Sequence, residues 1–172
     1  MKIISWNVNG LREIKKKGAF DKLLKDYSPD IFCIQETKSE MSQLNENIKN
    51  KKDFYSFFES AKNRKGYSGV AIYTKIKPEK VYYTMGYKEK DFLDNEGRTI
   101  ILEYKDFFLI NCYFPNGGKS EEHFYYKLDY YEKFLLLVRK LEKKKHVIFC
   151  GDINATVADI DLARPKENKD KL

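Results

Sequence analysis

The sequence predicts an α/β protein whose short strands end on polar side chains. Residues 147–150 form a wholly apolar run that stops at Gly151, and Asp152 and Asn154 follow two positions apart. A run this short and apolar is typical of a strand that is buried on both faces. A long helix precedes it, with apolar residues at three- and four-residue steps over 124–141. Together the two features predict a mixed α/β fold.

Three further strand-like runs also end on polar or aromatic side chains. They are residues 3–6 before Asn7, residues 31–35 before Glu36, and residues 108–112 before Tyr113. In open α/β sheets, ligand sites gather beyond strand ends, so we expect these ends to meet at one pocket. Asparagine, carboxylate and tyrosine side chains together are typical of a site that holds a hard metal ion and a phosphate group.

The remaining elements follow from the same patterns. The sequence predicts strands over 2–8, 54–59, 70–74 and 81–85, and a hairpin of 99–104 with 107–114. A helix is expected over much of 11–25, although Gly18 argues against a single unbroken helix. Residues 39–48 are weakly helical, and Ser120 is placed to cap the long helix. Only a polar tail is expected after Asn154.

Length and charge set the broad class of protein. The 172 residues predict one domain, spanning 1–172. Lysine and arginine number 33 against 26 aspartate and glutamate, which gives a formal net charge of +7. A basic surplus favours polyanionic partners, nucleic acid first and an anionic membrane surface second. The alternative is an ordinary lysine-rich solvated surface, and composition alone does not separate the two.

The cysteines and the start of the chain bear on the compartment. Cys33, Cys112 and Cys150 lie inside apolar strand runs and lack the spacing of a zinc site. An odd, buried set predicts core residues in a reducing compartment rather than a disulfide scaffold. No signal peptide is visible, and no apolar run approaches the length of a membrane span. We therefore expect a cytoplasmic protein that does not enter a membrane.

The polar strand ends suggest a definite chemistry. Mg²⁺ takes oxygen ligands, keeps several waters, and is usually held by one or two carboxylates with substrate phosphate. Glu36 is a candidate for that carboxylate, with Asn7 fixing its orientation. Asp152 is a candidate for the base that deprotonates a water, and Asn154 for the amide that orients it. Each residue also has an ordinary alternative, because strand-end carboxylates commonly cap a neighbouring turn.

Tyr113 and Asn116 complete this hypothesis as groups that hold phosphate oxygens. The alternative for Tyr113 is a packed aromatic ring with a hydrated hydroxyl. Spacing by itself supports a phosphate-ester hydrolase only weakly.

Six ordered blocks make the chain resemble the exonuclease III family. They are ISWNVNGLR at 4–12, IQETK at 34–38, GYSGV at 66–70, EGR at 96–98, NCYFPN at 111–116 and GDIN at 151–154, with IDLARPK at 160–166 as a further likeness. The resemblance implies the four-layer α/β sandwich of the endonuclease/exonuclease/phosphatase type. It also implies Mg²⁺-dependent hydrolysis of DNA 5′ to abasic sites, with 3′-to-5′ exonuclease activity and a role in base excision repair.

The resemblance also assigns roles to individual residues. It implies Glu36 as the principal metal ligand, with Asn7 and Asn9 beside it and Asp152 and Asn154 completing the metal and water site. The ion that the resemblance implies is Mg²⁺, with Mn²⁺ as the alternative. Tyr113 matches the family's active-site tyrosine and Asn116 an asparagine near the scissile phosphate. The DNA contacts implied are Arg12, Lys17, Tyr67 and Lys119. The partner implied is double-stranded DNA with abasic sites or 3′ ends, bound by a monomer.

The chain departs from the family pattern in two places. Val157 stands where several members have a histidine. The family also continues beyond this tail, with an Asn-bearing strand and a final Ser-Asp-His block that neither His123 nor His146 matches. We therefore expect a sandwich that is incomplete at the C-terminus, and a fragment that is inactive alone. Two alternatives stay open: a phosphatase or sphingomyelinase-like enzyme of the same fold, and a catalytically inactive DNA-binding fragment.

Overall fold

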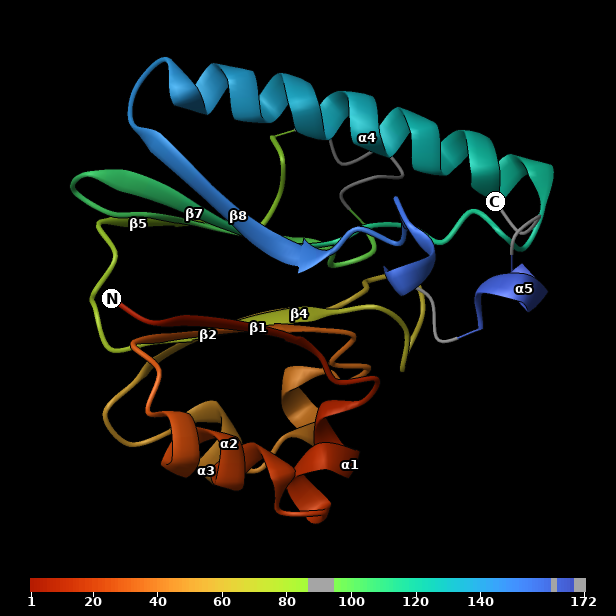
Figure 1. Cartoon of the computed structure of the whole chain (residues 1–172). Helices are drawn as coiled ribbons and strands as arrows, with labels where there is room; N and C mark the ends of the chain where they lie inside the picture. The colour runs from red at the N-terminus through yellow and green to blue at the C-terminus, as the bar shows by residue number, and fades with distance from the viewer. Residues whose placement is uncertain (87–94, 162–163, 169–172) are drawn as a thin grey trace.

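Two four-stranded sheets lie face to face, with helices on their outer sides (Figure 1). The computed structural model describes residues 1–86, 95–161 and 164–168. Helices α1 to α3 cover one sheet and α4 covers the other, so the order of layers is helix, sheet, sheet, helix (Figure 1). The predicted four-layer α/β sandwich is confirmed.

The first sheet has the strand order β1-β2-β4-β3. Its strands are β1 (Ile3–Asn7), β2 (Ile31–Gln35), β4 (Val70–Thr74) and β3 (Tyr55–Glu59). β1 and β2 pair in parallel, and the other pairs are antiparallel. Every residue of β2 and β4 is buried, because both strands are rich in apolar residues on both faces and lie in the centre of the sheet.

The second sheet has the strand order β5-β6-β7-β8. Its strands are β5 (Lys80–Tyr82), β6 (Thr99–Glu103), β7 (Phe107–Tyr113) and β8 (His146–Asp152). The expected hairpin is β6 with β7, and β8 pairs with β7 in parallel. The strand expected over 81–85 ends early, at Tyr82. The backbone N–H of Gly86 donates to the Thr84 hydroxyl at 3.0 Å, which closes a turn there instead.

One expectation for β8 is wrong. The run 147–150 was predicted to be buried on both faces, but Phe149 is 50% exposed. Among the described residues, β8 pairs only with β7 and so lies at the edge of its sheet. The apolar run therefore marks a strand correctly but does not place it in the middle of the sheet.

The helices begin and end where local signals place them. The segment 11–25 forms two helices, α1 (Leu11–Lys16) and α2 (Ala19–Tyr27), because Gly18 adopts a left-handed conformation with φ 72° between them. The weakly helical segment contains a 3₁₀ turn (Met41–Gln43) and α3 (Glu46–Lys49).

The long helix is α4 (Glu121–Glu142), and the Ser120 side chain accepts a hydrogen bond from the His123 N–H at its start. The predicted polar tail carries a 3₁₀ turn (Asp159–Asp161) and the short α5 (Pro165–Asn168). In the described part of the chain, no helix has the length and apolar character needed to cross a bilayer.

The core has three layers of apolar side chains, one between the sheets and one under each layer of helices. A polar pair interrupts the layer between the sheets. The Asn111 side chain donates to the carbonyl oxygens of Ile34 and Ala71 at 3.0 and 2.9 Å, and Gln35 donates to Asn111 at 2.7 Å. These buried bonds join β7 to β2 and β4, and so fix how the ends of the two sheets meet.

The cysteines are free thiols. Cys33 and Cys112 are buried as expected, and Cys150 on the edge strand is partly exposed. Burial raises the pKa of the Cys112 thiol to about 11, so this thiol is protonated at neutral pH.

Candidate active site

Strands β1, β2, β7 and β8 bring their carboxyl ends to one edge of the sandwich. The pairing sets Asn7 beside Gln35, the residue before Glu36, and sets Tyr113 beside Asp152. The expectation that these strand ends meet is therefore correct. Asn7 and Glu36 come from one sheet, and Tyr113 and Asp152 come from the other.

The Asn7 side chain joins the two carboxylates. Its amide nitrogen Nδ2 donates to Glu36 Oε1 at 2.8 Å and to Asp152 Oδ2 at 2.7 Å. A neutral amide thus holds two like charges close together, although like charges repel each other. This arrangement concentrates negative charge at a single point between the two sheets.

Lys38 supplies positive charge beside this pair. Its ammonium nitrogen Nζ lies 2.7 Å from Glu36 Oε2 and also donates to Asn9 Oδ1. The backbone N–H of Asn9 donates to Asn7 Oδ1 at 3.0 Å. Burial by itself raises the pKa of Glu36, but hydrogen bonds from Asn7, Lys38 and Tyr113 outweigh it, so the pKa lies below its ordinary value. Glu36 is consequently ionised at neutral pH.

Tyr113 and Asn154 close the other side of the cluster. The Tyr113 hydroxyl lies near Glu36 and Asn154, and burial followed by the Glu36 charge raises the pKa of Tyr113. The backbone N–H of Asn154 donates to Asp152 Oδ1 at 2.9 Å, and its side-chain amide donates to the Phe114 carbonyl at 2.7 Å. Tyr113 therefore stays protonated and can donate a hydrogen bond to an anion.

The backbone around the cluster is strained. Among the described residues, five non-glycine residues with positive φ belong to this end of the molecule: Asn9, Glu36, Lys38, Ser68 and Asn154. Such conformations cost on the order of 1–3 kcal/mol each and gather at functional sites. Gly151 has φ 144°, and a Cβ there would lie 1.8 Å from the Cys112 carbonyl oxygen. The glycine before Asp152 is therefore required by the close pairing of β7 and β8.

The donor set at this cluster fits a magnesium ion. In the described part of the chain, no three His, Cys, Asp or Glu side chains gather as a complete protein cage. Two carboxylates with neighbouring amides are what a hydrated Mg²⁺ uses. The Lys38 ammonium already lies against Glu36 as a cation, which shows that this carboxylate accepts positive charge at hydrogen-bond distance.

In the described structure, the other predicted residues make none of the contacts of this cluster. Asn116 is exposed, and its Oδ1 accepts from the Gly118 N–H at 2.9 Å, so it closes the loop that leads to α4. Arg12 and Lys17 are exposed on α1 and just after it. Lys119 Nζ lies 5.5 Å from the centre of the Tyr67 ring, so these two predicted DNA contacts are neighbours.

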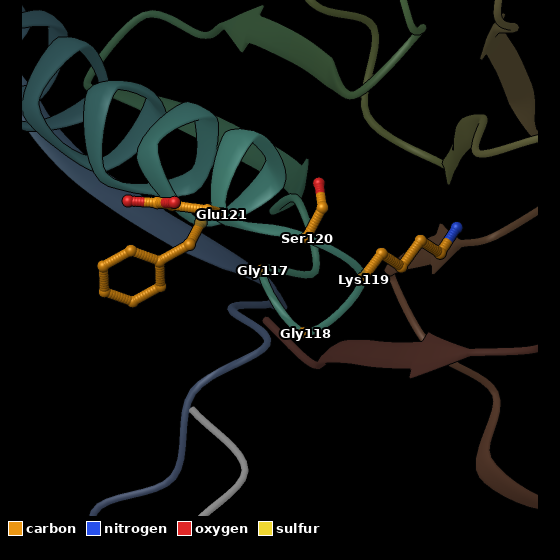
Figure 2. A pocket seen from close by; sticks show the side chains of 6 residues that line it. Gly117, Gly118, Lys119, Ser120 and Glu121 are labelled. Carbon is orange, nitrogen blue, oxygen red and sulfur yellow. The ribbon is translucent and has the colours of Figure 1, made fainter.

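An open hollow of about 290 Å³ adjoins Lys119 (Figure 2). It is lined by Gly117, Gly118, Lys119, Ser120, Glu121 and Phe124. None of these residues belongs to the cluster of Asn7, Glu36 and Asp152. The hollow therefore lies beside the candidate site and leaves the carboxylates outside it.

Sequence reasoning missed three charged residues near the site. Lys38 belongs to the IQETK segment, and its position two residues after Glu36 is the sequence signal that could have indicated it. Arg64 lies 4.7 Å from the centre of the Tyr67 ring, in a segment to which the sequence patterns assigned no role. Arg98 lies 4.9 Å from the centre of the Tyr113 ring, although its position in the sequence gave no sign of this contact.

Comparison with known proteins identifies the family. Residues 4–172 match the model of the endonuclease/exonuclease/phosphatase family. The chain belongs to this family. An exodeoxyribonuclease of Bacillus subtilis is 40% identical over 98% of this chain and 64% of its own length. A DNA-(apurinic or apyrimidinic site) endonuclease of Dictyostelium discoideum is 38% identical over 98% of this chain and 46% of its own length.

Solved structures agree with the sequence match. The structure of an AP endonuclease from Archaeoglobus fulgidus superimposes with a TM-score of 0.81 at 31% identity, over 99% of this chain and 64% of that one. The chain thus spans less than two thirds of the length of these three relatives. Nucleases of the endonuclease/exonuclease/phosphatase family are metal-dependent, which agrees with the paired carboxylates.

Proposed function

We propose that the chain is the metal- and phosphate-binding part of a DNA-repair phosphodiesterase. Its reaction is hydrolysis of DNA 5′ to abasic sites, together with removal of nucleotides from 3′ ends. The observation that carries the proposal is the Asn7 bridge between Glu36 and Asp152, which joins the two sheets at one anionic point. The names of the relatives, an exodeoxyribonuclease and AP endonucleases, support the substrate.

The metal proposed is Mg²⁺, with Mn²⁺ as the alternative, held by Glu36 and Asp152 with the amides of Asn7, Asn9 and Asn154 beside them. When bound, it supplies positive charge that neutralises a phosphate oxygen as negative charge develops there. The fit rests on the donor types and on the ionised state of Glu36.

The side chains of this chain divide the remaining work. Asp152 Oδ2 is placed to accept a proton from a water, which then attacks phosphorus as the bond to the 3′ oxygen breaks. Asn154 holds Asp152 through its own N–H and so fixes the direction of the carboxylate. Tyr113 stays protonated beside Glu36 and donates a hydrogen bond to a phosphate oxygen, and Asn116 lies on the adjoining loop for a second contact.

DNA binding is proposed to be electrostatic and independent of base sequence. The chain has a formal charge of +7, and Arg12, Lys17 and Lys119 are exposed. Contacts from such side chains to phosphates position a duplex without reading it, as a repair enzyme requires. An abasic sugar also leaves the helix at low cost because no base pair is broken. We propose in addition that the complete enzyme is a monomer in the reducing cytoplasm, in keeping with the free thiols.

The test is incision of a labelled duplex that contains one abasic site. Two proteins are compared, this chain alone and this chain fused after Leu172 to the remaining C-terminal third of the Bacillus subtilis relative. The proposal predicts retention of the duplex by both proteins and Mg²⁺-dependent incision by the fusion. Incision must stop with EDTA and with Asp152→Asn. Retention without incision in either protein would favour a DNA-binding role without catalysis.

A further inference from the structure

A buried ion pair lies behind the candidate site and has no part in the proposed chemistry. Arg98 Nε donates to Glu96 Oε2 at 2.6 Å, and the two side chains are 1% and 8% exposed. The Tyr126 hydroxyl from α4 donates to the same Glu96 oxygen at 2.9 Å. Moving a charge from water into the protein interior costs free energy. An ion pair this deeply buried therefore suggests a specific role for its contacts.

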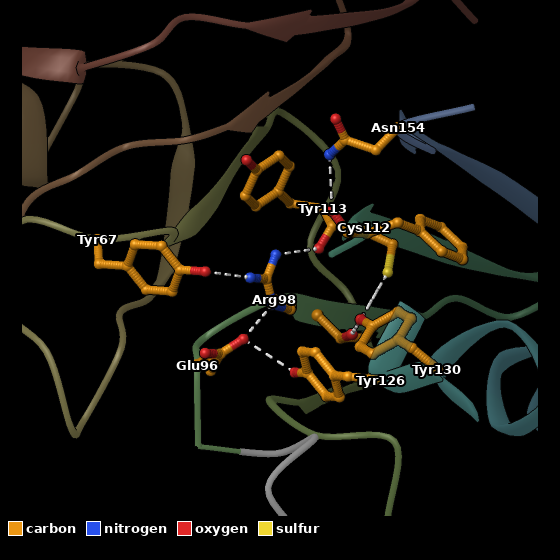
Figure 3. Close-up of polar contacts among 10 residues, drawn as sticks. Tyr67, Glu96, Arg98, Cys112, Tyr113, Tyr126, Tyr130 and Asn154 are labelled. Atoms are coloured by element: carbon orange, nitrogen blue, oxygen red, sulfur yellow. Dashed lines mark hydrogen bonds and ion pairs between the residues drawn. The ribbon is translucent and has the colours of Figure 1, made fainter. Parts of the chain in front are cut away.

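The rest of the Arg98 guanidinium reaches two tyrosines at once (Figure 3). Nη1 donates to the Tyr113 carbonyl oxygen at 3.0 Å, and the guanidinium carbon lies 4.9 Å from the centre of the Tyr113 ring. Nη2 donates to the Tyr67 hydroxyl at 3.0 Å. The three nitrogens of one planar group therefore hold a carboxylate, the backbone of β7 and a side chain on the loop before β4.

The two tyrosines have different roles in the proposed function. Tyr113 contacts Arg98 through its backbone carbonyl, pairs with Asp152 at the end of β7, and has its hydroxyl near Glu36. The Tyr67 ring is flanked by Arg64 and Lys119 at 4.7 and 5.5 Å, on the surface proposed for DNA phosphates. Arg98 is almost fully buried, so it does not itself offer a surface to DNA.

We propose that Arg98 is a positioning residue that holds Tyr113 and Tyr67 in one fixed relation, joining the phosphate-binding surface to the metal site. This inference rests on the proposed function. The fork of a guanidinium offers its donors in fixed directions, which a lysine ammonium cannot reproduce. Glu96 accepts hydrogen bonds from both Arg98 and Tyr126, and this contact keeps the Arg98 guanidinium from rotating.

The alternative is an ordinary structural ion pair, and Lys145 provides a control with similar kinds of contact at a more exposed position. Lys145 also contacts a carboxylate, a backbone carbonyl and an aromatic ring: Glu103 at 2.9 Å, Tyr104 O at 2.8 Å and the Phe108 ring at 5.6 Å. It lies at the opposite end of the second sheet, where Phe107 pairs with His146. Lys145→Arg and Arg98→Lys both keep the charge and change the head group.

The first experiment places a fluorotyrosine at position 113 in the full 172-residue chain and records its ¹⁹F NMR signal without DNA. The proposal predicts a shifted or broadened signal in Arg98→Lys and an unchanged signal in Lys145→Arg. Tyr67→Phe removes one acceptor of the fork without breaking the buried ion pair, and it should also move the signal. An unchanged signal in Tyr67→Phe, or an equal change in Lys145→Arg, would overturn the proposal even if Arg98→Lys fails to fold.

The second experiment measures the affinity of the same chains for an abasic duplex by fluorescence anisotropy. Arg98→Lys and Tyr67→Phe should each weaken binding by about ten- to hundredfold, the scale of one hydrogen bond to a charged group. The double variant should bind no more weakly than either single variant, because both break the same link. Additive losses would overturn the proposal. If the unaltered chain does not bind the duplex, the proposed function fails, while the fluorine signal still decides the role of Arg98.

Discussion

Charged side chains lie at both ends of the second sheet, but their partners differ. At the end where β8 begins, Lys145 lies between Glu103 and Glu79 at 2.9 and 3.4 Å, and the Tyr82 hydroxyl donates to Glu103 at 2.8 Å. Each carboxylate there faces a cation or a hydroxyl directly. At the end where β8 stops, Glu36 and Asp152 instead share one neutral amide.

The difference indicates what each end is for. Opposite charges that face one another at the surface contribute little to stability and call for no ligand. Two carboxylates on one amide leave an excess of negative charge, and Lys38 contacts only Glu36 of the pair. The backbone strain recorded in the described residues also favours the second end, with Glu36 and Asn154 both at positive φ. A metal ion would complete the charge balance there.

Substitutions at the two ends are expected to differ most in their effect on the rate of turnover. Asp152→Asn in whichever form of the protein incises abasic DNA should lower the single-turnover rate by about 10²- to 10⁴-fold, because the base that accepts the proton is lost. Affinity for DNA should stay the same or rise, since a negative charge near phosphate is gone. Glu103→Gln at the opposite end is the control and should leave the rate unchanged. A rate that falls only in step with binding would show that Asp152 acts in binding instead.

A second effect concerns the open strand edges at the site end. In the described structure β1 and β8 lie at the edges of their sheets and contact each other, and Phe149 is half exposed. Open edges with apolar side chains pair with other chains. We predict that the chain alone associates with copies of itself as its concentration rises, and that fusion to the C-terminal third of a relative abolishes this. Sedimentation velocity of both proteins measures it. Equal behaviour of the two would refute the prediction.

A third effect separates DNA contacts from catalysis. The logarithm of duplex affinity should fall linearly with the logarithm of salt concentration, and Lys17→Ala and Lys119→Ala should each reduce the slope by about one. Lys145→Ala, at the opposite end, should leave the slope unchanged. Anisotropy titrations at four or more salt concentrations provide the slopes. An affinity that does not depend on salt would point to a small-molecule phosphatase.

The smallest effect is expected for a substitution of Glu103, and it concerns how the thermal midpoint depends on pH. Hydrogen bonds from Lys145 and Tyr82 lower the pKa of Glu103 below the ordinary value of 4.5. A lowered pKa in the folded state contributes stability that is present above pH 4.5 and is lost as pH falls through the folded value. Glu103→Gln should therefore slightly reduce the thermal midpoint at pH 7 and have no effect near pH 2. A larger loss of the thermal midpoint at low pH than at neutral pH would contradict a lowered pKa of Glu103 in the folded state.

Sequence patterns located the candidate site because its residues follow strand runs directly. Asn7, Glu36, Tyr113 and Asp152 each end a run that is recognisable from a few neighbouring residues, and the structure places them together. The edge position of β8 could not be predicted in this way. An apolar run shows that a strand is covered by side chains, but it does not show how many strands lie beside it.

Contacts between segments that are distant in the sequence could not be predicted from these patterns either. Arg98 meets Tyr67 because the loop before β4 comes close to the start of β6, and no local pattern encodes that meeting. The strand predicted over 81–85 is longer than the observed β5, because Thr84 and Gly86 form a turn through a side-chain hydroxyl. In both cases a hydrogen bond made by one side chain decided the outcome, and apolar periodicity does not report such bonds.

The shared site of Glu36 and Asp152 can be tested most directly by Mn²⁺ binding, followed through the loss of the electron paramagnetic resonance signal of the free ion. The account predicts one site on the 172-residue chain, weakened at least about tenfold by Glu36→Gln and by Asp152→Asn, because each removes a charge that an amide does not replace. Glu103→Gln should bind Mn²⁺ as the unaltered chain does. Undiminished binding in both Glu36→Gln and Asp152→Asn would contradict the account.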